Sequence, residues 1–364
     1  MKILIPVLTF HNTGGSRVLS KLANELVLLG NDVEFLCPDG SAIPYFPTIA
    51  KISWIDKNGD LFQDNSHVGA GEKFFSIQKK LSRALAKIPI ASYDAIFANH
   101  SLTIMSIVKN GLVSKTLYYV QAYEPDYYRL QGGFKNCLLV LLSSLSYRKD
   151  IFTVVNADTY KKYKRLDTTK VLYPGIDFDL FFPKPTKSTN EKIIIGTVGR
   201  KEKYKGTEYI LLAFTIIRKK YPKAELHVAF GKPANFTNYS GVYCFQPNGD
   251  KDLGKYYRSL DYYFCAGYTQ LGAFHYPVVE AMRSGVPVIT TPYYPASDKN
   301  AWITKTCDEL DIVRRFEEAY TNPQLTQQKA AQALLDSEQF EWKKAGALLN
   351  QYFLELTGSG SKKK

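Results

Sequence analysis

Two cations follow a predicted buried strand near the middle of the 364-residue chain, and their type and spacing suit the binding of phosphate. Arg200 comes directly after the apolar run 193–198, and Lys205 follows on the same loop. Gly199 and Gly206 flank the two cations and indicate a loop of defined shape. Phosphate oxygens are bound well by such loop cations, and the absence of a Gly-Lys-Ser/Thr ending excludes a Walker P-loop. The alternative interpretation is a pair of solvated surface cations.

A second group of candidate residues lies in a later loop and the helix that it enters. The loop contains Gly272, Ala273, Phe274 and His275, and the helix contains Glu280. Free N–H groups and the positive dipole end of a helix favour a diphosphate at such a helix start. An ionised carboxylate such as Glu280 can accept two hydrogen bonds from a vicinal diol. The alternative for Glu280 is a helix N-terminal charge that the dipole stabilises.

In the first half of the chain, a glycine pair and a histidine follow predicted strands. Gly14 and Gly15 open the first predicted helix and let the backbone approach a phosphate or an acceptor oxygen closely. A plain strand-to-helix turn explains the pair equally well. His100 follows the apolar strand 95–98, where it could contact a ligand or serve as a hydrogen-bonded loop histidine.

Strand-like and helix-like patterns alternate around these residues, which is typical of parallel α/β sheets. The first such unit reads as a strand, a helix and a strand at 2–9, 17–29 and 32–37. A polar stretch, 184–192, interrupts the alternation before the strand 193–198 restarts it.

We therefore predict two α/β domains, 1–183 and 184–339, followed by a flexible tail at 358–364. Ligands of open parallel sheets bind outside the carboxyl ends of the strands. The functional site is accordingly expected in a cleft between the two domains.

The composition indicates which kind of partner the chain binds and in which compartment it is expected. The formal charge of +13 favours an anionic partner such as a nucleotide, an anionic membrane face or nucleic acid. The five cysteines contain no CxxC pair, which favours a reducing, cytoplasmic compartment and argues against a zinc site. The apolar run 138–142 is too short to span a bilayer, so any membrane contact is expected to be peripheral. Asp177-Phe178-Asp179 looks like a metal motif, but helix capping is the better interpretation, and no metal is predicted.

Several motifs in order along the chain resemble those of the retaining GT-B glycosyltransferases of family 4, the group 1 type, over nearly the whole length. They are Phe10 to Val18, Asp94 to His100, Tyr118 to Asp126, Tyr173 to Asp177, Phe182-Pro183, Val198 to Arg200, Lys205-Gly206 and the stretch from Phe274 to Thr291. The resemblance implies an α/β GT-B fold of two Rossmann-like domains facing across a cleft. It also implies metal-independent, retaining transfer of a sugar from a nucleotide-diphosphate donor to a hydroxyl of a glycan or lipid-linked glycan, with no cofactor besides the donor.

The resemblance also assigns roles to the candidate residues. Arg200 and Lys205 would stabilise the leaving diphosphate, and His100 would touch the donor sugar. Glu280 would hold the ribose hydroxyls, and Phe245 would flank the base. A final amphipathic helix, 340–357, would pack back on the first domain.

Two positions depart from the family pattern. The usual pattern has two glutamates separated by seven residues, and Gly272 stands where the first would be. His275 stands where a glycine is common. Both departures favour a donor with a different hydroxyl pattern, such as a deoxy sugar. The string from Tyr118 to Pro125 resembles bacterial rhamnosyltransferases that extend surface polysaccharides.

Two other functions stay open at this stage. The absent glutamate is compatible with a non-catalytic nucleotide-sugar-binding protein on the same fold. The charge of +13 is compatible with a glycosyltransferase that modifies nucleic acid, although no RNP-type motif is present. A cytoplasmic protein that contacts the inner face of the membrane is the expected setting.

Overall fold

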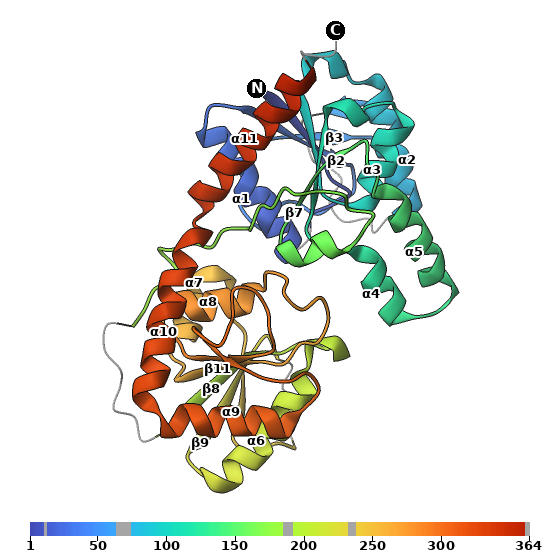
Figure 1. Cartoon of the computed structure of the whole chain (residues 1–364). Helices are drawn as coiled ribbons and strands as arrows, with labels where there is room; N and C mark the ends of the chain where they lie inside the picture. Colours follow the sequence, from blue (N-terminus) through green and yellow to red (C-terminus); the bar gives the residue numbers. More distant parts are fainter. Residues whose placement is uncertain (11–12, 63–73, 185–191, 232–237, 361–364) are drawn as a thin grey trace. The chain divides into compact units, whose positions relative to one another are not determined.

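The computed structural model describes residues 1–10, 13–62, 74–184, 192–231 and 238–360, which form two compact α/β units (Figure 1). Unit 1 comprises Met1–Gly175 and Trp342–Lys364, and unit 2 comprises Ile176–Glu341. Within the described residues, no helix combines the length and the apolar composition that crossing a membrane requires.

Unit 1 is built on a seven-stranded sheet with the order β4-β3-β2-β1-β5-β6-β7. All neighbouring strands are parallel except β4, which is antiparallel to β3. The strands are β1 (Lys2–Pro6), β2 (Asp32–Pro38), β3 (Lys51–Ile55), β4 (Leu61–Phe62), β5 (Ala95–Ala98), β6 (Thr116–Val120) and β7 (Phe152–Val155). The helices are α1 (Gly14–Leu28), α2 (Phe74–Lys87), α3 (Ser101–Lys109), α4 (Glu124–Gln131), α5 (Phe134–Ser146) and α11 (Trp342–Gly360).

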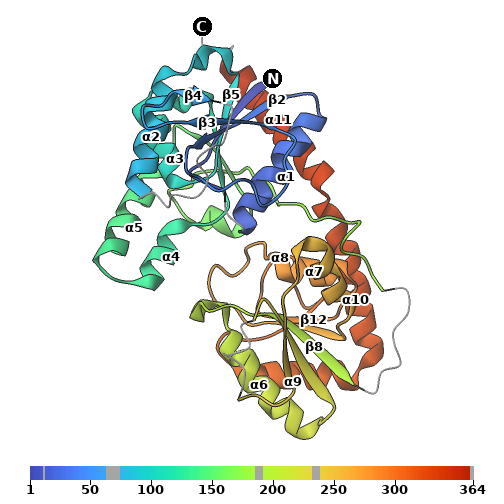
Figure 2. The same cartoon turned by 180° about the vertical axis from the view of Figure 1, so that it is seen from behind.

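Helices cover both faces of this sheet, which is why its central strands are apolar along their length. Figures 1 and 2 show α1 and α11 on one face and α2 and α3 on the other. The last helix contacts α1 closely, because a Cβ atom on Gly346 would lie 2.3 Å from the Cβ atom of Glu25. Phe353 of α11 is fully buried, with its ring 5.6 Å from that of Phe97 on β5. The helix that closes the chain is therefore part of the core of unit 1.

Unit 2 has a six-stranded parallel sheet with the order β10-β9-β8-β11-β12-β13. Figure 2 shows α6 and α9 on one face of this sheet and α7, α8 and α10 on the other. The strands are β8 (Ile193–Val198), β9 (Ala224–Ala229), β10 (Val242–Phe245), β11 (Tyr262–Cys265), β12 (Val288–Thr290) and β13 (Trp302–Ile303). The helices are α6 (Thr207–Lys220), α7 (Gly249–Arg258), α8 (Tyr276–Arg283), α9 (Glu309–Thr321) and α10 (Pro323–Ser337).

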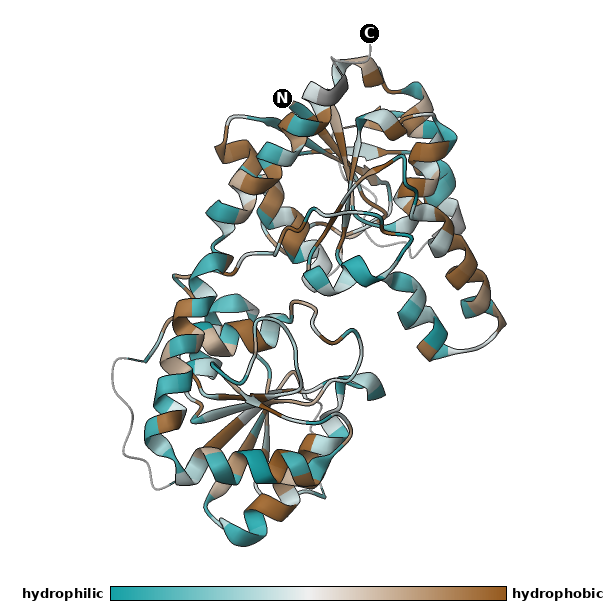
Figure 3. Cartoon of the chain, viewed as in Figure 1, coloured by the Kyte–Doolittle hydropathy of each residue, from teal (hydrophilic) through white to brown (hydrophobic). Residues whose placement is uncertain are grey.

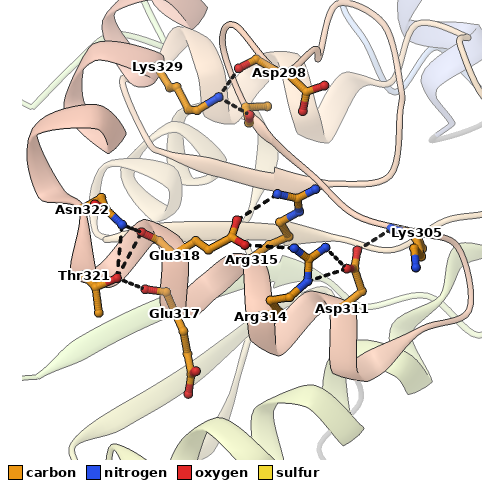
Figure 4. Close-up of polar contacts among 11 residues, drawn as sticks. Asp298, Lys305, Asp311, Arg314, Arg315, Glu317, Glu318, Thr321, Asn322 and Lys329 are labelled. Carbon is orange, nitrogen blue, oxygen red and sulfur yellow. Dashed lines mark hydrogen bonds and ion pairs between the residues drawn. The ribbon is translucent and has the colours of Figure 1, made fainter.

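Ion pairs fix the exposed side of α9 in unit 2 (Figure 4). The guanidinium of Arg314 bonds Asp311 one turn earlier and lies 3.0 Å from a carboxylate oxygen of Glu318 one turn later. Arg315 donates to the same Glu318 carboxylate at 2.8 Å. Arg314 and Arg315 are therefore paired with carboxylates of their own helix.

The two units meet in sequence at Gly175 and Ile176, whereas the polar stretch had suggested a boundary after residue 183. The apolar residues just before that stretch explain the difference, because they pack into unit 2. Phe181 is fully buried in its core, and the carbonyl oxygen of Leu180 accepts a 2.7 Å hydrogen bond from Arg258. The structure also continues α11 to Gly360, into the segment 358–364 predicted as a flexible tail.

Candidate functional site

The carboxyl edge of the unit 2 sheet gathers most of the predicted site residues. Arg200 follows β8, His275 ends the loop that follows β11, and Tyr293 follows β12. These three strands are neighbours in a parallel sheet, so their carboxyl ends lie at one edge. This edge is where ligands of such sheets bind.

The loop from Gly199 to Gly206 has a shape that packing imposes. Gly206 has φ +71°, and a Cβ atom there would lie 2.0 Å from the carbonyl oxygen of Ala266. A Cβ atom on Gly199 would lie 2.7 Å from a methyl carbon of Val228. Between the two glycines, the backbone N–H of Arg200 donates to the hydroxyl of Thr207 at 3.3 Å. The loop is therefore pressed against the sheet, as the flanking glycines predicted.

The two cations of this loop differ in environment. The side chain of Arg200 is exposed, whereas Lys205 is partly buried. Burial lowers the pKa of Lys205, and the nearby charge of Arg200 lowers it further. In the part of the chain that the structure describes, neither cation forms an ion pair with a carboxylate. Their charge is thus left for an anion that the described chain does not itself supply.

His275 lies beside these cations and is held in its neutral form. It caps the start of α8, and its ring stacks on that of Tyr293 with centroids 4.4 Å apart. Its Nδ1 atom lies 3.9 Å from the Sγ atom of Cys265. Burial, and then the charges of Lys205 and Arg200, hold the pKa of His275 well below its usual value. The structure therefore brings a neutral imidazole into electrostatic reach of both cations.

Two backbone amides of the loop before α8 are already hydrogen-bonded. The N–H of Gly272 donates to the carbonyl of Pro292 at 2.8 Å, and that of Ala273 donates to Gln270 at 3.1 Å. These two amides hold the loop together and are not free to bind a diphosphate. Phe274 is a packing residue, with its ring 5.1 Å from that of Phe340 and only 9% of its surface exposed.

Glu280 is a buried carboxylate in the second turn of α8. Only 2% of the residue is exposed, and its Oε2 atom accepts a 3.0 Å hydrogen bond from the hydroxyl of Tyr257 on α7. The structure corrects the alternative of an N-terminal charge, because Glu280 is the fifth residue of α8. Sequence reasoning missed Tyr257, whose only signal was a tyrosine at an apolar position of a helical pattern.

Phe245 ends the edge strand β10, where its side chain is 39% exposed. Its ring lies 4.7 Å from that of His227 and 6.2 Å from that of Tyr256. It thus presents a partly open aromatic face at the same edge of the sheet as the loop cations, beyond β9 in the strand order.

The remaining predicted residues belong to unit 1. Gly14 begins α1, and the carbonyl oxygen of Gly15 accepts a 3.2 Å hydrogen bond from the side chain of Gln121. His100 caps α3, and its Nδ1 atom accepts from the N–H of Leu102 at 3.2 Å. These residues follow β1, β5 and β6, which are neighbours, so they share the carboxyl edge of the unit 1 sheet. His100 is hydrogen-bonded at the start of α3, and its contact with the donor sugar stays a prediction.

The Asp177 motif does not cap a helix. Its carbonyl oxygen accepts hydrogen bonds from the N–H groups of Leu180 and Phe181 at 3.1 and 3.0 Å, which forms a turn. Among the described residues, no group of three or more His, Cys, Asp or Glu side chains is placed to hold a metal ion.

Solved structures of glycosyltransferases have the same fold. Sucrose-phosphate synthase from Thermosynechococcus elongatus matches with a TM-score of 0.77 at 15% identity, covering 99% of this chain and 100% of its own. The Anabaena protein HepE in complex with UDP-glucose matches with a TM-score of 0.71 at 15% identity, over 99% and 100% of the two chains. The fold is that of the GT-B glycosyltransferases, which confirms the predicted fold class.

Sequence comparison finds similarity to glycosyltransferases. Residues 178–334 match the family described as glycosyl transferases group 1. A protein of Haemophilus influenzae described as an uncharacterized glycosyltransferase is 22% identical over 366 residues, which cover 94% of this chain and 99% of that protein. The match over residues 178–334 confirms the similarity to the glycosyl transferases group 1 family that the motifs predicted.

Proposed function

We propose that this glycosyltransferase moves a sugar from a nucleotide-diphosphate donor to a hydroxyl of a glycan or lipid-linked glycan, with retention at the anomeric carbon and without a metal. The observation that carries the proposal is the cluster of Arg200, Lys205 and His275 at the carboxyl edge of the unit 2 sheet. Its two cations lack carboxylate partners among the described residues, and its imidazole is neutral.

The chemistry of the leaving group explains the cluster. When the sugar leaves, negative charge develops on the diphosphate, and fixed cations accelerate the step only if they lie where that charge grows. Arg200 and Lys205 sit on a loop that packing holds in place, so they need little reorganisation. Together they supply the two positive charges that a divalent metal would otherwise bring.

The retaining outcome follows from a front-face path. The leaving phosphate oxygen takes the proton of the acceptor hydroxyl, and the acceptor oxygen bonds to the face of the sugar from which the phosphate departs. In this path positioning and charge stabilisation provide most of the acceleration, and no protein nucleophile is needed.

The nucleotide would be held by Glu280 and Phe245. An ionised carboxylate has room for several hydrogen bonds, so Glu280 can keep the Tyr257 hydroxyl and still accept from a ribose diol. The half-open ring of Phe245 offers a stacking face for a base. HepE, which shares the fold, has been solved with UDP-glucose, so uridine diphosphate sugars are the first donors to test.

The donor sugar would be selected at Gly272 and His275. A glycine at position 272 offers no carboxylate to a sugar hydroxyl, and its φ of +79° is strained for a longer side chain. The neutral ring of His275 can donate or accept only one hydrogen bond at each nitrogen. Both features suit a deoxy sugar, and a bacterial polysaccharide rhamnosyltransferase is the specific form of this proposal.

A panel of nucleotide sugars tests the function in two stages. Thermal unfolding with each UDP-, GDP- and dTDP-sugar identifies the donor, because a ligand that binds the folded state raises apparent stability. The donor is then incubated with candidate acceptors, with and without EDTA, and NMR of the product gives the anomeric configuration. Inversion, or complete loss of turnover in EDTA, contradicts the mechanism. Protection without release of nucleotide favours the alternative of a non-catalytic binding protein, which the missing glutamate at Gly272 supports.

A further inference from the structure

Helix α5 of unit 1 exposes an apolar stripe. It has 13 residues, of which Lys135 is the one with a charge. Four exposed apolar side chains recur at helical spacing, and Figure 3 colours much of the helix as hydrophobic. They are Phe134, Leu138, Leu141 and Leu145, which are 88%, 45%, 57% and 57% exposed.

The opposite face of α5 makes the arrangement unusual for a helix in water. Its fully buried residues are two serines, Ser143 and Ser146. The hydroxyl of Ser146 lies 3.4 Å from that of Tyr118, inside unit 1. The helix thus packs on the unit through these serines and the half-buried Leu139, Val140 and Leu142, and it turns its other large apolar residues outward. Contiguous exposed apolar patches of this kind mark sites that bind another surface.

Basic residues lie near the stripe. Residues 124–150 contain four cations, Arg129, Lys135, Arg148 and Lys149, and three acids, Glu124, Asp126 and Asp150, so the segment carries a net charge of +1. Three of the cations pair with carboxylates, Arg129 with Asp126, Arg148 with Asp150 and Lys149 with Asp167, whereas Lys135 has no carboxylate partner among the described residues. A second basic run, 161–165, lies against the same helix, because the guanidinium of Arg165 donates to the carbonyl oxygen of Ser144 at 3.3 Å. An apolar stripe flanked by cations is complementary to a partner that has an apolar interior and an anionic outer layer.

We infer that α5 and its basic flanks form a docking surface for an anionic lipid bilayer. The helix is about 20 Å long at 1.5 Å per residue, which is too short to cross a hydrocarbon core of about 30 Å. It lies instead along the interface, with the stripe among the acyl chains and the cations at the headgroups. A second copy of the chain fits less well, since it would bring an equally positive flank to the same contact.

Vesicle co-sedimentation tests the docking surface. Wild-type protein is mixed with vesicles of phosphatidylcholine alone or with added phosphatidylglycerol, at several salt concentrations. The wild type should bind the anionic vesicles at least tenfold more strongly than the neutral ones, and less strongly as salt rises. Equal binding to both vesicle types, or no binding to either, overturns the inference.

Matched variants separate the stripe from general hydrophobicity. Replacing Leu141 and Leu145 with serine should lower vesicle binding at least tenfold. The control replaces Leu335 and Leu354, which are 57% and 55% exposed on other helices, and should bind as the wild type does. If both pairs behave alike, the stripe is not the docking surface.

A second pair of variants tests the charge. Replacing Lys135 and Lys164 with glutamine should reduce the preference for anionic vesicles, whereas the same change at the exposed Lys251 and Lys299 should not. An equal effect of both pairs would show attraction by net charge alone and would count against the surface.

Two further measurements keep this inference separate from the proposed function. The residues proposed above to hold the donor lie in unit 2. The donor should therefore protect the serine variants of α5 against heat as well as it protects the wild type. If no nucleotide sugar in the panel protects the protein, the proposed function is contradicted, but the vesicle binding result is unaffected. Size-exclusion chromatography across a range of concentrations detects self-association, and a dimer that the Leu141 and Leu145 variant loses would replace the bilayer with a second copy as the occupant.

Discussion

Replacing Arg200 with alanine should remove catalysis while leaving the fold intact. The side chain is exposed, and its residue is tied to Thr207 through the backbone N–H, which alanine keeps. Surface changes away from such features usually alter the free energy of unfolding by less than about 0.5 kcal/mol. We therefore expect an unfolding midpoint close to that of the wild type.

The loss of turnover can be estimated from the charge. A cation about 4 Å from a unit charge contributes about 4 kcal/mol at an effective dielectric constant of about 20. Only the charge that develops in the transition state counts toward the rate, and deleting one such electrostatic group in other enzymes costs about 10²–10³-fold in kcat. We expect a decrease in kcat within that range, which corresponds to about 2.7–4 kcal/mol.

The assay measures nucleotide released from the donor that the thermal panel selects. Lys201 is a matched control, because it is the next residue of the same loop and is also exposed. Its alanine variant should keep kcat within about threefold of the wild type. Urea unfolding of both variants shows whether the fold has changed.

Two results would refute the reasoning. If the Arg200 variant keeps near-normal turnover, the cation does not act on the leaving group. If the Lys201 variant loses as much activity as the Arg200 variant, the effect comes from the net charge of the loop rather than from the placed guanidinium.

Three further predictions follow from the same unit. The Glu280→Ala variant should raise the donor KM at least tenfold. The Tyr257→Phe variant removes a hydrogen bond to the Glu280 carboxylate, so it should lower the free energy of unfolding by about 1.5–3 kcal/mol with little change in KM. Equal effects of the two variants on KM would contradict a direct contact between Glu280 and the ribose. Because the pKa of His275 is lower in the folded chain than its unfolded value of about 6.5, stability should fall as pH drops below about 6.5, and urea unfolding of His275→Gln should show a flatter pH dependence. Gly206→Ala should cost about 2–5 kcal/mol, since φ is +71° and a carbonyl oxygen lies 2.0 Å from the new Cβ atom, whereas Gly111→Ala, at φ +69° with nothing within 4 Å, should cost about 1–2 kcal/mol in urea unfolding.

Much of the secondary structure follows from local pattern. The apolar runs at 2–9 and 193–198 contain β1 and β8, and the helix predicted at 17–29 overlaps α1. Such runs can be recognised as strands in the sequence because strands buried on both faces must be apolar throughout.

The unit boundary shows where local pattern stops being sufficient. The polar stretch after residue 183 looks like a linker, but the apolar turn before it belongs to unit 2 because Phe181 fills that core. The amides of Gly272 and Ala273 give the same lesson. Their partners, Pro292 and Gln270, could not be inferred from the loop itself.

By itself, the sequence determined the class of fold and indicated the residues that we propose bind a diphosphate, because strand periodicity, glycine spacing and cation placement are local properties of the chain. Only the tertiary structure decided the environment of those residues. Contacts from distant segments bury Glu280 against Tyr257, keep His275 neutral beside Lys205, and turn the leucines of α5 outward. Burial and pairing depend on which segments pack together, and that information is absent from any single stretch of the chain.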